Sequence, residues 1–290
     1  MTRPLTRRRF IALSAAALAA PQGASAETWR GIAMGAQAEI TLSGPGPQVR
    51  AALAEVRGLI RAVEAAFNLH DPASELSRLN ARGHLSPSPL FAALIAWTSR
   101  LHAATGGLFD PSVQPLWRAR FEGRAGEAEA VGWQRVQTGP EIRLAPGQAL
   151  TFNGIAQGYA TDLAAQALKA RGFREVLVNI GEFAALGSGW HIGIADPAHG
   201  LLAQRRLSDS ALATSSPAAM PMTGGHILGP GGQAPRWSTV SVEAESATLA
   251  DGLSTALCLA GERQIARIRA RLSGVRRVVV VDGDGSLKTL

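Results

Sequence analysis

The sequence predicts a mixed fold of the α+β or α/β class, built as one large domain or as two intimately joined halves. Apolar residues recur at helical spacing in some segments and alternate in others, so helices and strands are interspersed along the chain. Behind a predicted leader of 26 residues, 264 residues remain (290 − 26), a length that suits one large domain. The sequence contains no internal repeat and no long low-complexity linker.

Residues 1–26 have the layout of a twin-arginine signal peptide. A twin-arginine pattern at 6–11 precedes the apolar run 11–20 and the cleavage site Ala24-Ser25-Ala26. A short membrane anchor is the weaker alternative, because the run is too short to span a bilayer comfortably. No cysteine directly follows this segment, so we expect no lipid anchor, a mature chain beginning near Glu27 and a periplasmic location.

Charge and cysteine content narrow the class of protein further. The formal net charge of +7 includes four arginines of the leader and falls to about +3 (7 − 4) without them. We therefore expect no nucleic-acid partner. Cys258 is the single cysteine and lies in an apolar helical pattern. An internal disulfide is therefore excluded, and a small buried apolar role is favoured over that of a nucleophile.

The elements of the first half follow from apolar spacing and from turn residues. Alternation around Met34-Gly35 predicts a hairpin, and serine N-caps with glycine stops bound the helices. We expect a hairpin over 29–42, helices over 49–67, 74–80 and 88–106, a surface loop over 121–130, and short strands at 135–137, 141–144 and 150–152.

The second half is interpreted in the same way. We expect helices over 155–170 and 248–259, strands at 175–180, 190–195, 239–242 and 278–281, and a further helix before the last strand. The segment 282–285, DGDG, resembles part of a calcium loop but lacks the other ligands, so a hairpin turn is favoured.

A glycine-rich loop is the most informative segment of the chain. The stretch 150–162, LTFNGIAQGYATD, runs from an apolar end through Gly154 and Gly158 into a helix. Glycine allows the backbone to approach a ligand closely, and the free N–H groups of a helix start favour phosphate. Many such turns are glycine-rich for packing alone, so the loop has weight only together with other segments.

Six segments, taken in order, resemble the ApbE family of FAD:protein FMN transferases. They are Met34-Gly35, the stretch 71–80, the stretch 105–112, the loop 153–159 with Asp162, the pair of 213–215 with His226-Ile227, and the stretch 250–256. Together they cover nearly the whole chain after the leader. The resemblance implies an α+β, T-fold-like single domain over 27–290, with two intimately associated α/β halves, mixed or antiparallel sheets and packed helices.

The resemblance also implies a reaction. FAD, as substrate, is cleaved with Mg²⁺ to AMP, and FMN is attached to a Ser or Thr hydroxyl of an acceptor redox protein in the membrane or periplasm. Asp251 and Thr255 are four residues apart on a predicted helix, so both project from one face. The resemblance implies that these side chains and the Gly154 carbonyl bind the metal. From the residues alone, Asp251 could instead favour the positive end of its helix.

The remaining site residues are also implied by the resemblance. His226 is the candidate base, since an imidazole titrates near neutrality. Asp251 is the second expected catalytic residue. The residues expected to contact FAD are Met34, His70, Leu108, Phe109, Asp110, Thr151, Gln157 and Ile227.

The chain departs from the family pattern at several of these positions. Gln157 stands where lysine is frequent, His70 where tyrosine is common, and Thr151 where aspartate is frequent. Gly229 replaces an aspartate in the segment after His226. Because the change at Gly229 lies on the side of the site expected to handle the transfer, two alternatives stay open. One is an FAD diphosphate hydrolase, and the other is a non-catalytic FAD-binding accessory protein for periplasmic electron transfer.

Overall fold

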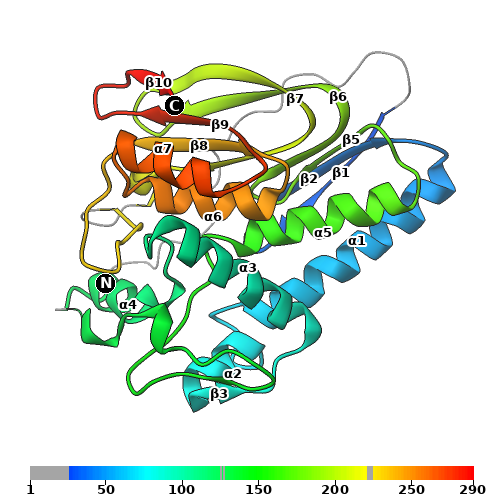
Figure 1. Cartoon of the computed structure of the whole chain (residues 1–290). Helices are drawn as coiled ribbons and strands as arrows, with labels where there is room; N and C mark the ends of the chain where they lie inside the picture. The colour runs from blue at the N-terminus through cyan, green and yellow to red at the C-terminus, as the bar shows by residue number, and fades with distance from the viewer. Residues whose placement is uncertain (1–25, 125, 127, 221–224) are drawn as a thin grey trace, which may run out of the picture.

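A single antiparallel sheet organises the molecule. The computed structural model describes residues 26–124, 126, 128–220 and 225–290. Within these residues, eight strands form one sheet in the order β1-β2-β5-β6-β7-β8-β9-β10, and every neighbouring pair is antiparallel (Figure 1). The strands are β1 Ala26–Ala33, β2 Ala36–Ser43, β5 Val176–Asn179, β6 Phe183–Asp196, β7 Gly200–Ser215, β8 Thr239–Ala244, β9 Val275–Val281 and β10 Leu287–Thr289. The predicted signal peptide lies outside the described residues, except for Ala26.

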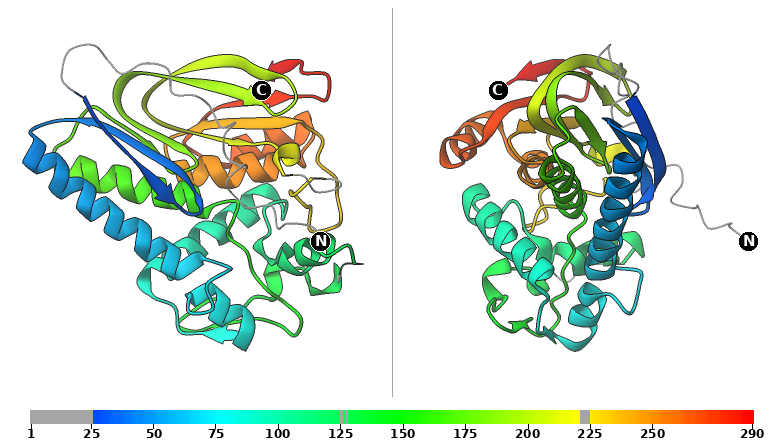
Figure 2. Two further views of the ribbon diagram at one scale, coloured as in Figure 1. Left: turned by 180° about the vertical axis from the view of Figure 1, so that it is seen from behind. Right: turned by 90° about the vertical axis from the view of Figure 1, so that its right-hand side faces the viewer.

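The helices form two groups (Figure 1). Four lie along the sheet: α1 Gly46–Phe67, α5 Ala156–Ala170, α6 Ala247–Leu257 and α7 Glu262–Arg271. Three lie farther from it, with a two-stranded sheet of β3 His84–Leu85 and β4 Ile142–Arg143: α2 Glu75–Arg82, α3 Pro89–Thr105 and α4 Gln114–Phe121. Short 3₁₀ turns occupy Pro111–Val113, Ala128–Ala130, Trp133–Arg135 and Pro217–Ala219. The side view in Figure 2 shows the sheet curving over the helices.

The predicted first hairpin is confirmed. Its two turn residues, Met34 and Gly35, both have positive φ angles, 52° and 77°. A two-residue turn of this hand matches the twist of the paired strands. The left-handed conformation is unusual for methionine, and the Met34 backbone N–H donates a 2.8 Å hydrogen bond to Oε1 of Glu64 on α1. Helix α1 therefore helps to fix the turn.

The predicted serine caps are also confirmed. Ser74 accepts a hydrogen bond from the Ser77 N–H and begins α2, and Ser88 accepts one from the Phe91 N–H and begins α3. A side-chain oxygen at this position satisfies a helix N–H that has no partner within the helix. Gly83 and Gly106 end these helices in the left-handed conformation, as a glycine after a helix commonly does.

Two predicted strands are absent from the structure, and one helix was not predicted. Residues 135–137 do not form a strand, since Trp133–Arg135 is a 3₁₀ turn and Gln137 makes only an isolated bridge with Arg143. The segment 150–152 also lies outside any strand. Its Leu150 instead exchanges hydrogen bonds of 2.7 and 2.9 Å with the side chain of Asn80. Helix α4 was missed, because an early proline and two arginines hide its pattern.

The hairpin of β6 and β7 is much longer than the predicted strand at 190–195. Register shifts interrupt its pairing, which breaks the alternation in the sequence. The hairpin curls over a small second core that includes Trp190, Ile192 and Leu207. Arg205 and Arg206 of β7 lie outside this core, and they interrupt the apolar alternation by which a strand is predicted from sequence. The principal core lies between the other face of the sheet and the helices.

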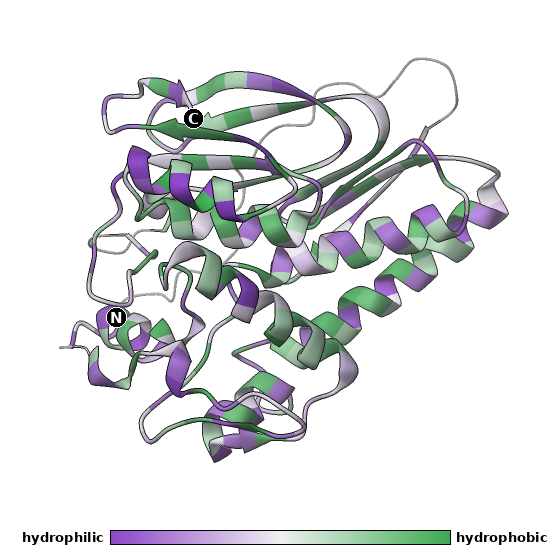
Figure 3. Cartoon of the chain, viewed as in Figure 1, coloured by the Kyte–Doolittle hydropathy of each residue, from purple (hydrophilic) through white to green (hydrophobic). Residues whose placement is uncertain are grey.

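Helix α1 and an aromatic cluster define the interior of the principal core. In Figure 3 the green and purple turns of α1 alternate, as expected for an amphipathic helix that buries one face. The ring of Phe67, at its end, lies 4.9 Å from that of Phe91 and 5.4 Å from that of Phe152. Tyr159 on α5 completes the cluster, with its ring centroid 6.3 Å from that of Phe67.

Among the described residues, no helix is both long and apolar enough to cross a membrane.

Asp162 on α5 fastens the beginning of α6. Its carboxylate accepts hydrogen bonds from the Ser246 hydroxyl at 2.6 Å, from the Ala247 and Thr248 N–H groups at 2.8 and 2.9 Å, and from the Thr248 hydroxyl at 2.5 Å. An anionic acceptor at a helix N-terminus satisfies unpaired donors and complements the helix dipole. One side chain therefore sets the position of α6 relative to α5.

Replacing Asp162 with alanine should destabilise the protein, because two backbone donors at the start of α6 lose their acceptor. We expect a loss of about 2–3 kcal/mol in the free energy of unfolding, measured by urea denaturation. Asp162→Asn, which retains one acceptor oxygen, should lose less. Equal stability of the alanine variant and the wild type would contradict this role.

Candidate active site

Helix α5 and helix α6 touch where Gly158 has no side chain. The Gly158 N–H donates a 2.9 Å hydrogen bond to Oδ2 of the buried Asp251. A Cβ at residue 158 would lie 2.3 Å from the Ala247 carbonyl oxygen and 2.7 Å from Cβ of Asp251. Only glycine permits this approach. Gly158 is therefore required for the packing of α5 against α6, and this packing places the loop next to the Asp251 carboxylate.

Gly154 and Thr255 form the second contact between the loop and α6. A Cβ at residue 154 would lie 2.8 Å from Oγ1 of Thr255. The Thr255 hydroxyl is also 3.3 Å from the Ser215 hydroxyl, which in turn is 2.8 Å from that of Ser254. The structure therefore brings the three predicted metal-binding residues, Gly154, Asp251 and Thr255, to one place, with the end of β7 beside them.

Burial sets the electrostatics of Asp251. It raises the pKa of this carboxyl from 3.8 to about 7, although the Gly158 N–H stabilises the charged form and lowers it. The charge of Asp162 raises the pKa further. A cation bound at this carboxylate would reverse the effect of burial.

Glu182 is a residue of the site that the sequence analysis missed. It is buried just before β6, and its Oε2 accepts a 3.1 Å hydrogen bond from the Thr214 N–H. Burial raises its pKa well above the ordinary value, and the charge of nearby Asp251 adds to the shift. Its position directly after a buried strand and Gly181 is the signal that could have identified it.

The donor set fits a hard divalent cation. Asp251 offers a carboxylate whose Oδ1 accepts no hydrogen bond from the described residues, and Thr255 offers a hydroxyl. Oxygen donors of this kind, completed by water and phosphate, suit Mg²⁺. Within the described ranges, no three His, Cys, Asp or Glu side chains are grouped to hold a metal. The protein thus provides a partial coordination shell, which a phosphate ligand could complete.

His226 contacts Pro217, just beyond the end of β7. Its Nδ1 is 3.0 Å from the Pro217 carbonyl oxygen, which can only accept, so Nδ1 carries the proton and Nε2 keeps its lone pair. Burial lowers the pKa of this imidazole, while the Pro217 carbonyl raises it. The ring is therefore neutral at pH 7. Pro217 lies two residues after Ser215, so the contact brings His226 close to the end of β7.

The predicted FAD contacts fall into two groups. Gln157, Met34 and His70 are at least partly exposed. Gln157 approaches the Gly181 backbone, since a Cβ there would lie 2.5 Å from its Nε2. Met34 is at the first hairpin turn, and His70 is in the loop between α1 and α2. Their roles stay predictions.

The second group has structural roles as well. Phe109 and Ile227 are buried in the principal core, and Leu108 packs against it. Asp110 is buried and accepts hydrogen bonds from the Ser112 hydroxyl, the Ser112 N–H and the Trp133 N–H, at 2.6, 2.8 and 3.1 Å. Thr151 caps a local turn by accepting a 3.3 Å hydrogen bond from the Asn153 N–H.

Gly229, where the resemblance leads us to expect an aspartate, is part of a tight turn. Its N–H donates to the Gln233 carbonyl at 3.2 Å, and its carbonyl accepts from the Gly232 N–H at 2.9 Å. A Cβ at residue 229 would lie 2.1 Å from Oε1 of Gln233. The Gln233 side chain therefore fills the space beside Gly229.

Comparison with known proteins identifies the family. The model of the ApbE family matches residues 34–279. A curated FAD:protein FMN transferase of Rhodobacter capsulatus is 30% identical over 277 residues, which cover 84% of this chain and 53% of the relative. The chain therefore spans about half the length of that relative.

Solved structures share the fold. The apo flavinyl transferase ApbE of Pseudomonas stutzeri is 27% identical, with a TM-score of 0.78, and the match covers 92% of this chain and 94% of that one. The ApbE protein of Thermotoga maritima is 24% identical, with a TM-score of 0.81, and covers 91% and 96%. The flavin transferase ApbE of Vibrio cholerae is also 24% identical, with a TM-score of 0.77, and covers 91% and 97%.

Gly158→Ala should force α5 and α6 apart. The added methyl group overlaps the Ala247 backbone, which cannot move as a flexible side chain would. We expect a loss of about 1–3 kcal/mol in the free energy of unfolding, measured by chemical denaturation. Gly283→Ala is the matched control, because nothing lies within 4 Å of a Cβ there. Equal stability of both variants would show that the helices tolerate separation.

The metal-free protein should lose stability as pH rises from about 4 to 7. Asp251 has a folded-state pKa of about 7 against 3.8 for the unfolded chain, so the folded state holds an extra proton in this window. The contribution of this group to the free energy of unfolding is fully present below pH 3.8 and is lost as pH rises through about 7. We expect a decrease of about 1–3 kcal/mol from this group, measured by urea unfolding at pH 4.5 and 7.5. Asp251→Asn should flatten the profile, and an unchanged slope would contradict the assignment.

Proposed function

The chain belongs to the ApbE family, and we propose from this premise that it is an FAD:protein FMN transferase that depends on Mg²⁺. In the proposed reaction, an acceptor Ser or Thr hydroxyl attacks the FMN-side phosphorus of FAD. The bond to the AMP phosphate breaks, FMN remains on the acceptor as a phosphoester, and the hydroxyl proton passes to a base.

One observation carries the proposal: the glycine loop lies directly against Asp251 and Thr255 of α6. A loop of this kind can receive a diphosphate, and among the described residues the N–H groups of Gly154 and Gln157 are the ones left without a partner there. Asp251, Thr255 and the Gly154 carbonyl would hold Mg²⁺, which would neutralise charge on the diphosphate and assist the leaving group. Glu182 adds a second buried carboxyl, so a cation is favoured there.

His226 is the proposed base. Its neutral imidazole has Nδ1–H held by the Pro217 carbonyl, which leaves Nε2 to take a proton from the acceptor hydroxyl. We propose that Met34, His70 and Gln157 contact FAD, because all three are at least partly exposed, at the first hairpin turn, between α1 and α2, and in the glycine loop respectively. Leu108, Phe109, Asp110, Thr151 and Ile227 would support the same pocket from the core.

We also propose that the protein is exported by the twin-arginine route and acts in the periplasm. The leader-like sequence of residues 1–26 supports this. The acceptor would then be a redox protein exposed to that compartment, in the membrane or soluble. A non-catalytic FAD-binding accessory protein is the candidate that the altered turn at Gly229 favours, because the aspartate of the family segment is missing beside His226. Hydrolysis of FAD to FMN and AMP, with water in place of the acceptor hydroxyl, is the other alternative.

Asp251→Ala should abolish Mg²⁺-dependent turnover, because the only carboxylate proposed as a metal ligand is removed. We expect at least a 100-fold loss of FMN transfer, on the order of 3 kcal/mol or more. The assay incubates the purified protein with FAD, Mg²⁺ and a co-expressed candidate acceptor, and follows covalent flavin by in-gel fluorescence and intact mass together with AMP release. Asp284→Ala, the same change in the exposed turn after β9, is the matched control.

The outcomes of this assay separate the alternatives. Labelled acceptor with equimolar AMP supports the transferase, and AMP without label supports the hydrolase. Bound FAD with neither product supports an accessory protein, provided that an active transferase labels the same acceptor. Unchanged turnover in Asp251→Ala would refute the metal assignment.

A further inference from the structure

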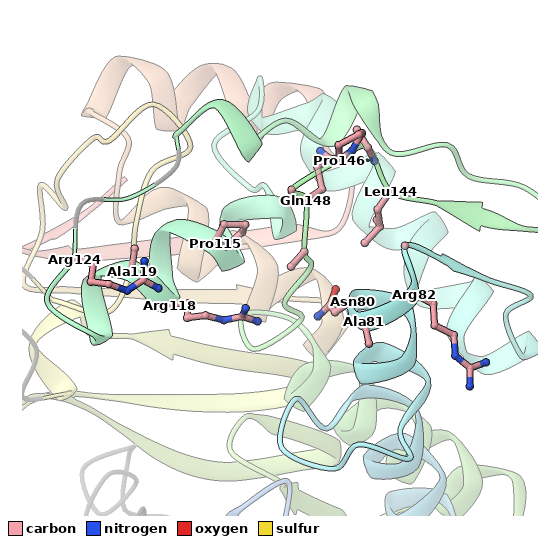
Figure 4. A pocket seen from close by; sticks show the side chains of 14 residues that line it. Asn80, Ala81, Arg82, Pro115, Arg118, Ala119, Arg124, Leu144, Pro146 and Gln148 are labelled. Atoms are coloured by element: carbon pink, nitrogen blue, oxygen red, sulfur yellow. Dashed lines mark hydrogen bonds between the residues drawn. The ribbon is translucent and has the colours of Figure 1, made fainter.

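A second concave surface lies apart from the Asp251 site. A cavity of about 490 Å³ opens between the end of α2, the helix α4 and the loop 144–149 (Figure 4). None of its lining residues belongs to the glycine loop or to α6. Its volume lies within the range of about 300–1,000 Å³ that is usual for ligand pockets. The cavity is therefore large enough for part of a partner molecule.

The lining of this cavity carries positive charge only. It includes Arg82, Arg118 and Arg124, and no aspartate or glutamate. Arg124 donates to Glu122 through Nε at 2.8 Å, so its charge is already compensated. Arg82 and Arg118 are exposed and form no ion pair within the part of the chain that the structure describes. Figure 4 shows Arg118 extending from α4 toward Asn80 on α2.

An exposed aromatic pair lies beside the cavity on the same helix. Trp117 and Phe121 of α4 stack with ring centroids 5.4 Å apart and planes at 7°. Phe121 is 66% exposed, which is unusual for a large apolar side chain. It lies one helical turn after Arg118, so aromatic surface and guanidinium are neighbours. Aromatic residues and arginine are the types enriched where proteins bind other proteins.

We propose that the α4 pocket, whose lining includes Arg82 and Arg118 and which Phe121 adjoins on α4, docks an acidic, extended segment of the protein that receives the flavin. This inference rests on the proposed function. Charge complementarity decides the occupant: guanidinium groups pair bidentately with carboxylates, and an apolar residue of the segment would cover Phe121. The concave shape favours a peptide over a flat membrane surface. Docking outside the Asp251 site would let the protein select its acceptor without changing how FAD is held.

The test has two parts, and the first needs no acceptor. Fluorescence anisotropy measures binding of a labelled peptide of alternating glutamate and leucine to the full-length protein. We expect Arg82→Glu/Arg118→Glu to weaken binding at least tenfold. Ala81→Trp should also weaken it, because it fills the lining at an exposed position without changing charge. The control Arg263→Glu/Arg267→Glu makes the same charge change on the exposed face of α7 and should bind as the wild type does.

The second part measures FMN transfer to the candidate acceptor. We expect the pocket variants to raise the KM for the acceptor at least tenfold while kcat and FAD binding stay unchanged. Equal peptide binding by wild type and pocket variants would overturn the proposal. Loss of binding to anionic phosphatidylglycerol vesicles, with peptide binding unaffected, would overturn it in favour of a membrane contact. If the wild type binds peptide through the pocket but transfers no flavin, the proposed function fails and the docking surface stands.

Discussion

The close approach of α5 to α6 is the constraint on which the rest of the site depends. Gly158 allows the Ala247 backbone to lie where any side chain would have been, and Asp162 holds the first turn of α6 against α5. With the two helices fixed in this way, Gly154 meets Thr255 and the Gly158 N–H meets Asp251. The position of every proposed metal ligand therefore follows from one contact between helices, and the sheet behind them supplies the rigid support.

Two buried carboxyl groups give the site its electrostatic character. Asp251 and Glu182 lie where burial disfavours their charged forms, and only single backbone N–H groups from Gly158 and Thr214 offset this. Keeping both groups charged costs stability unless a positive charge is present, which is the electrostatic ground for the cation proposed at this site. His226 has the opposite character, because burial keeps its imidazole neutral and therefore able to accept a proton.

Local signals predicted much of this structure, and contacts between distant segments account for the rest. The Met34-Gly35 hairpin, the serine-capped helices and the grouping of Asp251 with Thr255 follow from spacing and turn chemistry. Glu182 was missed because its one local signal, the position after a buried strand and Gly181, does not show that α6 places Asp251 nearby. The strand β7 was missed because its outer face is polar and its register shifts, and Leu150 was wrongly assigned because its hydrogen bonds go to the Asn80 side chain and not to a strand.

The single cysteine has a practical consequence. Cys258 is fully buried at the end of α6, where burial raises the pKa of its thiol and Sγ lies 3.3 Å from the Ser254 carbonyl oxygen. A thiol that keeps its proton and has no access to solvent reacts slowly with electrophiles. In the folded protein, Cys258 is therefore expected to react little with a thiol-specific label. A cysteine placed on an exposed helix could carry a spin label or a fluorophore, and the distance between α4 and α6 could be measured without first removing a native residue.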